Sequence, residues 1–73
     1  MYPMSMDKLS PAQNRVYRAL KRYVKKNGIA PSRGDLGKEL KLYPNGIQAH
    51  LRVLERKGYI RIIPNTSRGI VVL

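Results

Sequence analysis

The feature of this sequence that most limits its fold is a close succession of helix boundaries within 73 residues. A first helix is predicted to start at Ser10 and Pro11, because serine can cap free amide groups and proline suits the first helical position. Gln13 stands where the partner of a capping box belongs. Asn27 and Gly28 then end the helix, since glycine adopts the left-handed conformation at little cost. A helix bounded this closely depends on packing against the rest of the chain.

Two further helices are predicted to follow at short intervals. Ser32 is a capping residue with Asp35 three positions later, so a second helix starts there. Residues 42–43 form a tight turn, and a third helix is expected over residues 44–57, closed by Gly58. Two helices joined by so short a turn form a helix-turn-helix unit.

The remaining segments are predicted to be β-structure. Residues 59–63 are rich in β-branched and aromatic side chains and stop at Pro64, and residues 70–73 form a returning strand. Residues 65–69 between them have the composition of a turn. Residues 29–31 are too short for a helix, and we expect them to form a short extended strand between the first two helices.

This order of elements predicts an α+β fold, a three-helix winged helix-turn-helix with a small antiparallel β-hairpin as its wing. We expect one domain over residues 10–73, preceded by a flexible amino-terminal arm over residues 1–9. A chain of 73 residues has room for only one core.

Net charge is the feature of composition that most narrows the function. Fifteen lysines and arginines stand against four acids, which gives +11 and favours a polyanionic partner. Double-stranded DNA is the expected partner. Membrane binding is disfavoured, because no apolar run is long enough to span a bilayer and no apolar helix face is left over for insertion. The first residues lack the pattern of a signal peptide, so we expect a cytoplasmic protein associated with the nucleoid.

Neither enzymatic activity nor a cofactor is expected. The chain has no cysteine and only one histidine, so neither a disulfide framework nor a metal site is predicted. The four acids are scattered, and no nucleophile can be matched to a neighbouring base. So small a domain also leaves little room for a catalytic cleft.

The third helix is predicted to carry the residues that contact bases. At about 100° per residue, Ile47, Leu51 and Leu54 fall on one side, and small or polar side chains fall on the other. Amides can bond adenine edges, arginine can bond guanine or phosphate, and alanine leaves room for a thymine methyl. The predicted base-reading residues are Asn45, Gly46, Gln48, Ala49 and Arg52. A merely solvated helix surface is the alternative, but the start of the second helix of such a unit meets bases.

Contacts with the DNA backbone are predicted around this helix and at the hairpin turn. An arginine beside hydroxyl groups can contact phosphate or enter a minor groove, although an ordinary polar turn has the same composition. The predicted backbone-contacting residues are Ser32, Arg33, Tyr43, Arg56, Thr66, Ser67 and Arg68.

A second basic surface is predicted on the outer face of the first helix. It consists of Arg18, Lys21, Arg22 and Lys25, with no acid among them. We expect part of this charge to point away from bound DNA, behind the third helix. The surface is then either an ordinary solvated face, or it serves long-range steering, a second DNA segment or an acidic protein partner.

A family resemblance rests on several pieces of the chain taken in order. These are Leu9-Ser10 with Gln13 and Val16, residues 27–33, Pro44-Asn45, His50-Leu51 with Leu54, residues 56–60, and residues 67–70. Together they resemble the amino-terminal DNA-binding domain of LexA-type SOS repressors. The resemblance implies a winged helix that binds an inverted-repeat operator and blocks transcription. Tight binding would need a homodimer on that operator, adjacent sites or a partner. It also implies DNA contacts on the third helix and its start and at the wing, by Asn45, Gly46, Gln48, Ala49, Tyr43, and Arg68 with its neighbours.

Departures from the family pattern change some of these expectations. Tyr43 stands where family members often carry serine, and Gln48-Ala49 stand where the enterobacterial type has two glutamates. We therefore expect a different operator sequence. The family's self-cleaving peptidase and dimerisation domain has no counterpart in these residues, so autoproteolysis is not expected. The chain is then either a stand-alone regulator, as on a phage, plasmid or archaeal element, or a fragment.

Two other functions stay open at this point. A non-specific architectural or accessory DNA-binding protein, as in packaging, replication or recombination, would use the charge and not the helix edge. A winged-helix protein-interaction module would use the basic surface of the first helix. Both DNA-binding functions weaken with salt, so only the ratio of specific to random affinity separates them.

Overall fold

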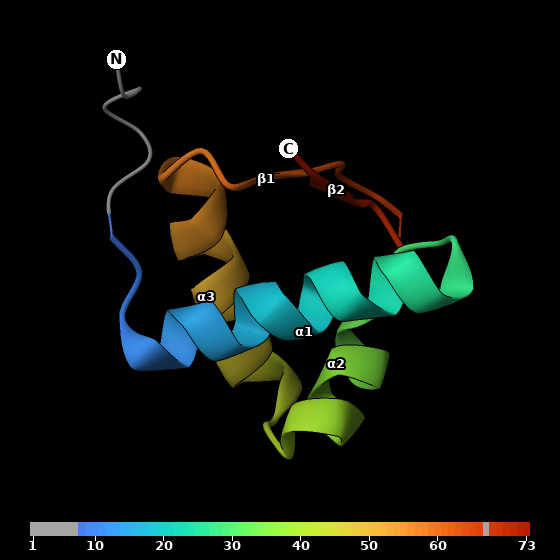
Figure 1. Cartoon of the computed structure of the whole chain (residues 1–73), viewed down its shortest axis with the longest axis horizontal. Coiled ribbons are helices and arrows are strands. Elements are labelled where there is room, and N and C mark those ends of the chain that lie inside the picture. Colours follow the sequence, from blue (N-terminus) through green and yellow to red (C-terminus); the bar gives the residue numbers. More distant parts are fainter. Residues whose placement is uncertain (1–7, 67) are drawn as a thin grey trace.

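The computed structural model describes residues 8–66 and 68–73, which form three helices followed by an antiparallel β-hairpin (Figure 1). The elements are α1 (Pro11–Asn27), α2 (Arg33–Leu40), α3 (Pro44–Arg56), β1 (Ile60–Ile62) and β2 (Ile70–Val72). This confirms the predicted α+β winged helix-turn-helix. Of the predicted arm, residues 1–7 lie outside the described part, whereas Leu9 packs against the core.

Local sequence signals explain where α1 and α2 begin. The Ser10 hydroxyl accepts a hydrogen bond from the Gln13 amide at 3.2 Å, and Gln13 Oε1 accepts one from the Ser10 amide at 3.1 Å. Ser32 and Asp35 make the same reciprocal pair at the start of α2, both bonds being 3.1 Å long. α1 ends at Gly28, whose φ of +75° lies in the left-handed region that glycine tolerates best. Both predicted capping boxes are thus confirmed.

Residues 29–31 do not form the predicted strand. Within the described residues the sheet has only β1 and β2. The carbonyl of Ala30 instead accepts a hydrogen bond of 2.9 Å from the Arg68 side chain. An extended segment becomes a strand only when its backbone pairs with a neighbouring backbone, so this segment is a link. The third helix and both strands are also shorter than predicted, by a single residue at each changed end.

One aliphatic core is shared by the three helices and the hairpin. α3 lies at its centre, because it contacts α1, α2 and β1. The buried residues of the core are Val16, Ala19, Leu20, Leu36, Ile47, Leu51, Leu54, Ile60 and Ile70. No polar or charged residue is buried within residues 8–66 and 68–73. Hydrophobic burial therefore supplies the driving force, and polar groups act at the surface of the fold.

The hairpin is held against α3 by its buried face and by one side chain. β1 and β2 pair antiparallel with Arg61 opposite Val71 at the centre. Arg61 is exposed while Ile60 next to it is buried, as the alternation of the sequence predicts. Glu55 of α3 accepts a hydrogen bond of 2.9 Å from the Ile62 amide. This bond adds a polar connection between the helix and the first strand.

The turn between α2 and α3 brings two backbone segments unusually close. Lys41 adopts a left-handed φ of +57°, and the Leu42 amide donates a hydrogen bond of 3.0 Å to the Gly37 carbonyl. A Cβ atom on Gly37 would lie 2.7 Å from the Leu42 carbonyl oxygen. The tight helix-turn-helix connection therefore depends on a residue without a side chain at position 37.

Gly37→Ala should lower the free energy of unfolding by about 1–3 kcal/mol, the usual cost of overpacking, because the turn has to shift. Gly46→Ala is the matched control, since Gly46 is also helical but its Cβ would meet nothing within 4 Å. The control should gain about 0.5–1 kcal/mol from helix propensity. Denaturant unfolding of both variants, followed by circular dichroism, measures the difference. Equal stabilities would contradict the steric explanation.

Candidate nucleic-acid interface

The outward side of α3 carries the predicted base-reading residues. The exposed members of this side are Asn45, Ala49, Arg52 and Arg56, and the half-buried ones at its flank are Gly46 and Gln48. The leucines and isoleucine of the opposite side are completely buried in the core. The structure thus places these side chains on one accessible side of one helix. Their contact with bases stays a prediction.

α3 starts without a capping side chain. Tyr43 is the N-cap residue, and its side chain makes no capping hydrogen bond. Pro44 occupies the first helical position, where its missing amide hydrogen removes no helical bond. The amides of the next residues point out of the helix end, which also carries the positive end of the helix dipole. The Tyr43 side chain is 86% exposed beside them.

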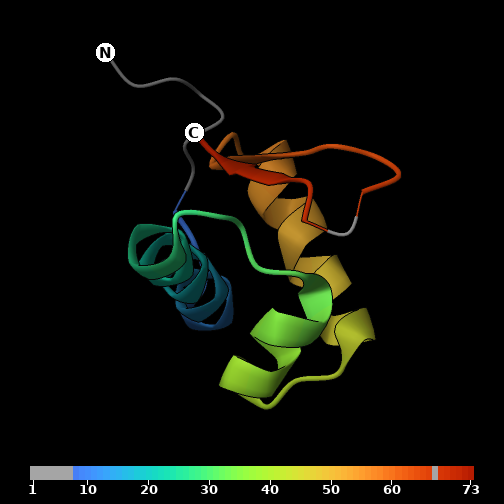
Figure 2. The ribbon, with the colours of Figure 1, turned by 90° about the vertical axis from the view of Figure 1, so that its right-hand side faces the viewer.

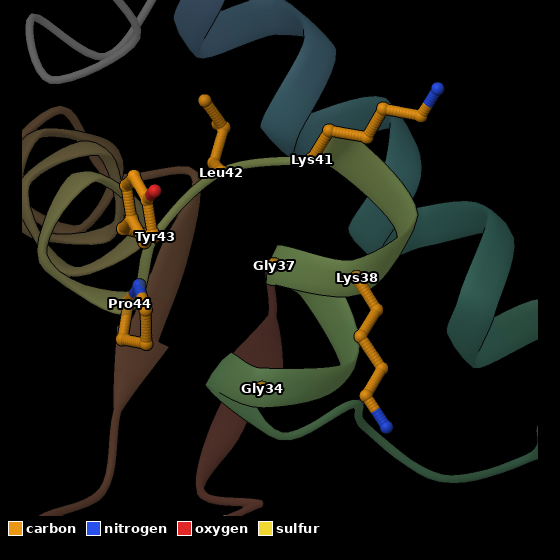
Figure 3. Close-up of a pocket in the computed structure, with 7 residues that line it drawn as sticks. All are labelled: Gly34, Gly37, Lys38, Lys41, Leu42, Tyr43 and Pro44. Atoms are coloured by element: carbon orange, nitrogen blue, oxygen red, sulfur yellow. The ribbon is translucent and has the colours of Figure 1, made fainter.

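A groove of about 450 Å³ lies between α2 and this helix start. Its lining consists of Gly34, Gly37, Lys38, Lys41, Leu42, Tyr43 and Pro44. In Figure 3 Tyr43 and Pro44 stand on one side and the two glycines of α2 on the other, while the ammonium ends of the two lysines extend outward. The groove is open because the glycines place no side chain in it, and positive charge lies at its edge.

Arg33 and Gln48 lie together, although the sequence assigned them to separate contacts. Arg33 is the first residue of α2, and its Nε donates a hydrogen bond to Gln48 Oε1 of α3. Both side chains are half-buried. The two residues are 15 positions apart, and only the packing of α2 on α3 brings them together. Their pairing has no local signal in the sequence, because it depends on how the two helices pack.

Ser32 is used within the fold. Its hydroxyl oxygen accepts the Asp35 amide as the helix cap of α2, which leaves the hydroxyl hydrogen as its means of contacting a phosphate. The predicted backbone contact of Ser32 stays a prediction. Of the hairpin-turn residues, Thr66 is exposed and Ser67 lies outside the described residues.

Arg68 joins the hairpin turn to the start of α2. Its Nη1 donates a hydrogen bond of 2.9 Å to the Ala30 carbonyl and lies 3.1 Å from Asp35 Oδ2. The Tyr23 hydroxyl donates to the same carboxylate oxygen at 3.3 Å. A hydrogen bond with Tyr23 and the charge of Asp35 both raise the pKa of Arg68. The DNA contact of Arg68 stays a prediction, and its guanidinium holds the hairpin turn against Ala30 and Asp35.

Several hydrogen bonds lower the pKa of Asp35 below its ordinary value. The largest effect comes from the Ser32 amide, and partial burial works in the opposite direction. The Ser32 hydroxyl, the Arg68 charge and the Tyr23 hydroxyl lower the pKa further. Asp35 is therefore ionised at neutral pH and connects the cap of α2 with the wing.

Asp35→Asn tests this connection through pH. Since the folded pKa lies below the unfolded pKa of about 3.9, ionised Asp35 stabilises the fold above that value, and the stabilisation is lost as pH falls through it towards the lower folded pKa. The melting temperature of the parent should therefore fall more steeply below about pH 5 than that of Asp35→Asn. Thermal unfolding at a series of pH values measures this. Glu39→Gln, which removes the same charge from α2, should keep the steep dependence, and equal behaviour of the two variants would refute the assignment.

The predicted basic surface on α1 is present and exposed. Its members are Arg18, Lys21, Arg22 and Lys25. Arg22 Nη2 lies 2.8 Å from Glu39 Oε2 of α2, so part of its charge is neutralised. Lys21 Nζ lies 5.2 Å from the centre of the Tyr17 ring, within the range of a cation–π interaction.

The helix α1, which carries the basic surface, lies on a different side of the molecule from the start of α3 and the hairpin turn. In Figure 2 the helix α1 lies at the left, whereas the start of α3 and the hairpin turn lie at the right. In this view the start of α3 and the hairpin turn therefore lie on the side of the molecule opposite α1.

Within the described residues, no helix is long and apolar enough to cross a membrane. The same part of the chain holds no group of three or more histidine, cysteine or acidic side chains that could bind a metal ion.

Comparison with known proteins agrees with the geometry. The family model described as LexA DNA binding domain matches residues 6–69. The LexA repressor of Pasteurella multocida is 46% identical over 66 residues, and those of Geobacter metallireducens and Thermosipho melanesiensis are 44% identical over 66 and 43% identical over 65 residues. Each match covers 89% of this chain. The resemblance inferred from the sequence is thereby confirmed.

The chain spans about a third of the length of these curated relatives. It covers 31% of the Pasteurella protein and 33% of the other two. The similarity is thus to the DNA-binding part of these repressors and does not extend to the rest of them.

Proposed function

Because the chain belongs to the LexA DNA-binding domain family, we propose that it is a sequence-specific double-stranded DNA-binding repressor that acts by occupying an operator and blocking a promoter. The observation that supports this best is the exposed side of α3, on a helix whose start lies on the same side of the molecule as the hairpin turn (Figure 2). A helix and a wing in this arrangement can contact the major groove and the adjacent backbone. The net charge of +11 attracts the phosphates.

In the proposed complex the first turns of α3 lie in the major groove and α2 crosses the backbone. Asn45, Ala49 and Arg52 then meet base edges, and Arg56 and Tyr43 meet the sugar-phosphate strands. The groove between α2 and the start of α3 then faces a phosphate strand, with the two lysines of its lining at its α2 edge. The uncapped amides at the start of α3 offer further hydrogen bonds to that strand.

The wing contributes mainly by its fixed position. Arg68 holds the hairpin turn against α2 through Asp35 and the Ala30 carbonyl. Thr66, which is exposed at the turn, is then carried towards the backbone next to α3. The same contacts also set the direction in which the other N–H groups of Arg68 could donate to a phosphate.

Two copies on an inverted-repeat operator are part of the proposal. One helix and one wing make a small interface, of about 600–1,000 Å² for a single DNA-binding module, and so bind weakly alone. Two half-sites spaced by one helical turn add the contacts of both copies. Sedimentation of the protein with an operator and with a single half-site distinguishes two bound copies from one.

Asn45→Ala and Gln48→Ala should each reduce discrimination by about 1–3 kcal/mol at the base pair that the side chain contacts. The operator is first selected from random duplexes, and the affinities of variants for it and for single-base changes are then measured by mobility shift. Asn14→Ala is the matched control, because Asn14 is an exposed amide on α1. It should leave the preference unchanged.

The same measurements separate the repressor from an architectural DNA-binding protein. An architectural protein would bind the selected and the random duplex alike, with log affinity falling by about 0.9 per neutralised phosphate against log salt. Intact preference after both amide substitutions would refute the role of α3.

The α1 surface supports a second, separate contact with an acidic protein partner or a second DNA segment. In Figure 2 the helix α1 lies on the opposite side of the molecule from the start of α3 and the hairpin turn. Reversal of Arg18, Lys21 and Lys25 to glutamate should weaken binding to all duplexes through the loss of net charge, yet leave the ratio of specific to random affinity unchanged. A fall in that ratio would show that α1 belongs to the operator contact.

A further inference from the structure

The amide of Gln48 is oriented by Arg33. The Arg33 Nε donates to Gln48 Oε1, and a guanidinium carries only donors, so the oxygen of the amide must be the end that faces it. Both side chains are half-buried where α2 packs on α3, which limits the alternatives open to each. The NH₂ group of Gln48 is therefore the end left to face a ligand.

The neighbourhood of this pair presents donors without a competing carboxylate. Besides Asp7, which lies outside the described residues, the chain has three acids. Asp35 bonds Ser32 and Arg68, Glu39 pairs with Arg22, and Glu55 bonds the Ile62 amide. Each is thus engaged with a group other than Arg33. Only the Nε of Arg33 donates to Gln48 Oε1, and the other N–H groups of the same guanidinium are further donors next to this bond.

Such a pair matches one base better than the others in the major groove. Guanine presents two acceptors there, O6 and N7, whereas adenine presents the N7 acceptor and the N6 donor. A free glutamine can match adenine by accepting from N6 and donating to N7. When a cation holds the glutamine oxygen, only donors remain to face the base. The adenine N6 group is also a donor, so it cannot form a hydrogen bond with them.

Resting on the proposed operator binding, we propose that Arg33 is a positioning residue that makes Gln48 a hydrogen-bond donor, so that this part of α3 selects guanine over adenine. Arg33 was expected to contact only the DNA backbone. In this assignment it determines specificity through a second side chain.

The test compares the duplex selected by the protein with versions that exchange guanine for adenine at each position. The parent should prefer guanine at a base pair where Gln48→Ala removes the preference. Arg33→Ala should reduce that same preference by about fivefold or more, the lower end for one good base contact, and leave the other positions unchanged. The double variant Arg33→Ala with Gln48→Ala should lose no more of this preference than Gln48→Ala alone.

Two further variants keep the result interpretable. If Arg33→Ala folds poorly, Arg33→Met replaces it in the test, because methionine retains an aliphatic stem at this half-buried position. Arg33→Met should then show the same loss of preference for guanine. Lys38→Ala removes an exposed charge from the same helix, and should lower affinity for all duplexes equally.

If the Arg33 variants lose affinity equally for all duplexes, the inference is overturned, and Arg33 contacts phosphates. The proposed sequence-specific binding would be unaffected by that result. A preference for adenine at the Gln48 base pair in the parent would overturn it as well. A parent without any sequence preference would refute the proposed function, and the inference with it.

Discussion

Complete burial of one face of α3 is the constraint on which the rest of the structure depends. Ile47, Leu51 and Leu54 have no exposed surface, and the helix is contacted from three directions by α1, α2 and β1. Turning the helix by one position, about 100°, would expose this face at about 25 cal/mol for each Å² of apolar surface. The rotation of α3 is therefore fixed by the core, and the identity of the outward-facing side chains follows from it.

The first turn of α2 connects the hairpin turn and α3 through polar contacts. Ser32 and Asp35 cap α2, Asp35 also pairs with Arg68 of the hairpin turn, and Arg33 bonds Gln48 of α3. A hydrogen bond contributes only about 1 kcal/mol net, and an exposed ion pair contributes less. These bonds matter chiefly because they set the orientation of the wing and of one side chain on α3, while the aliphatic core supplies the stability.

The sequence was sufficient wherever the deciding interactions are local. Each capping box joins residues three positions apart, and the glycine end of α1 and the two faces of α3 follow from spacing alone. It was insufficient where side chains from separate elements meet. The prediction of a strand at residues 29–31 was wrong, because the Ala30 carbonyl accepts its hydrogen bond from the Arg68 side chain and not from a neighbouring strand. Arg33 with Gln48, and Arg68 with Asp35, are pairs that only the packed helices bring together.

The position of α1 has a consequence for the time course of DNA binding. Charges act on an approaching duplex over roughly a Debye length, about 8–10 Å at physiological salt, whichever surface finally touches it. The encounter rate therefore responds to cations near the approaching duplex, including some on α1. In the proposed complex, the counterions released at equilibrium reflect only the phosphates that α3, α2 and the wing contact. Association kinetics and equilibrium affinity should accordingly depend on different subsets of the fifteen cationic residues.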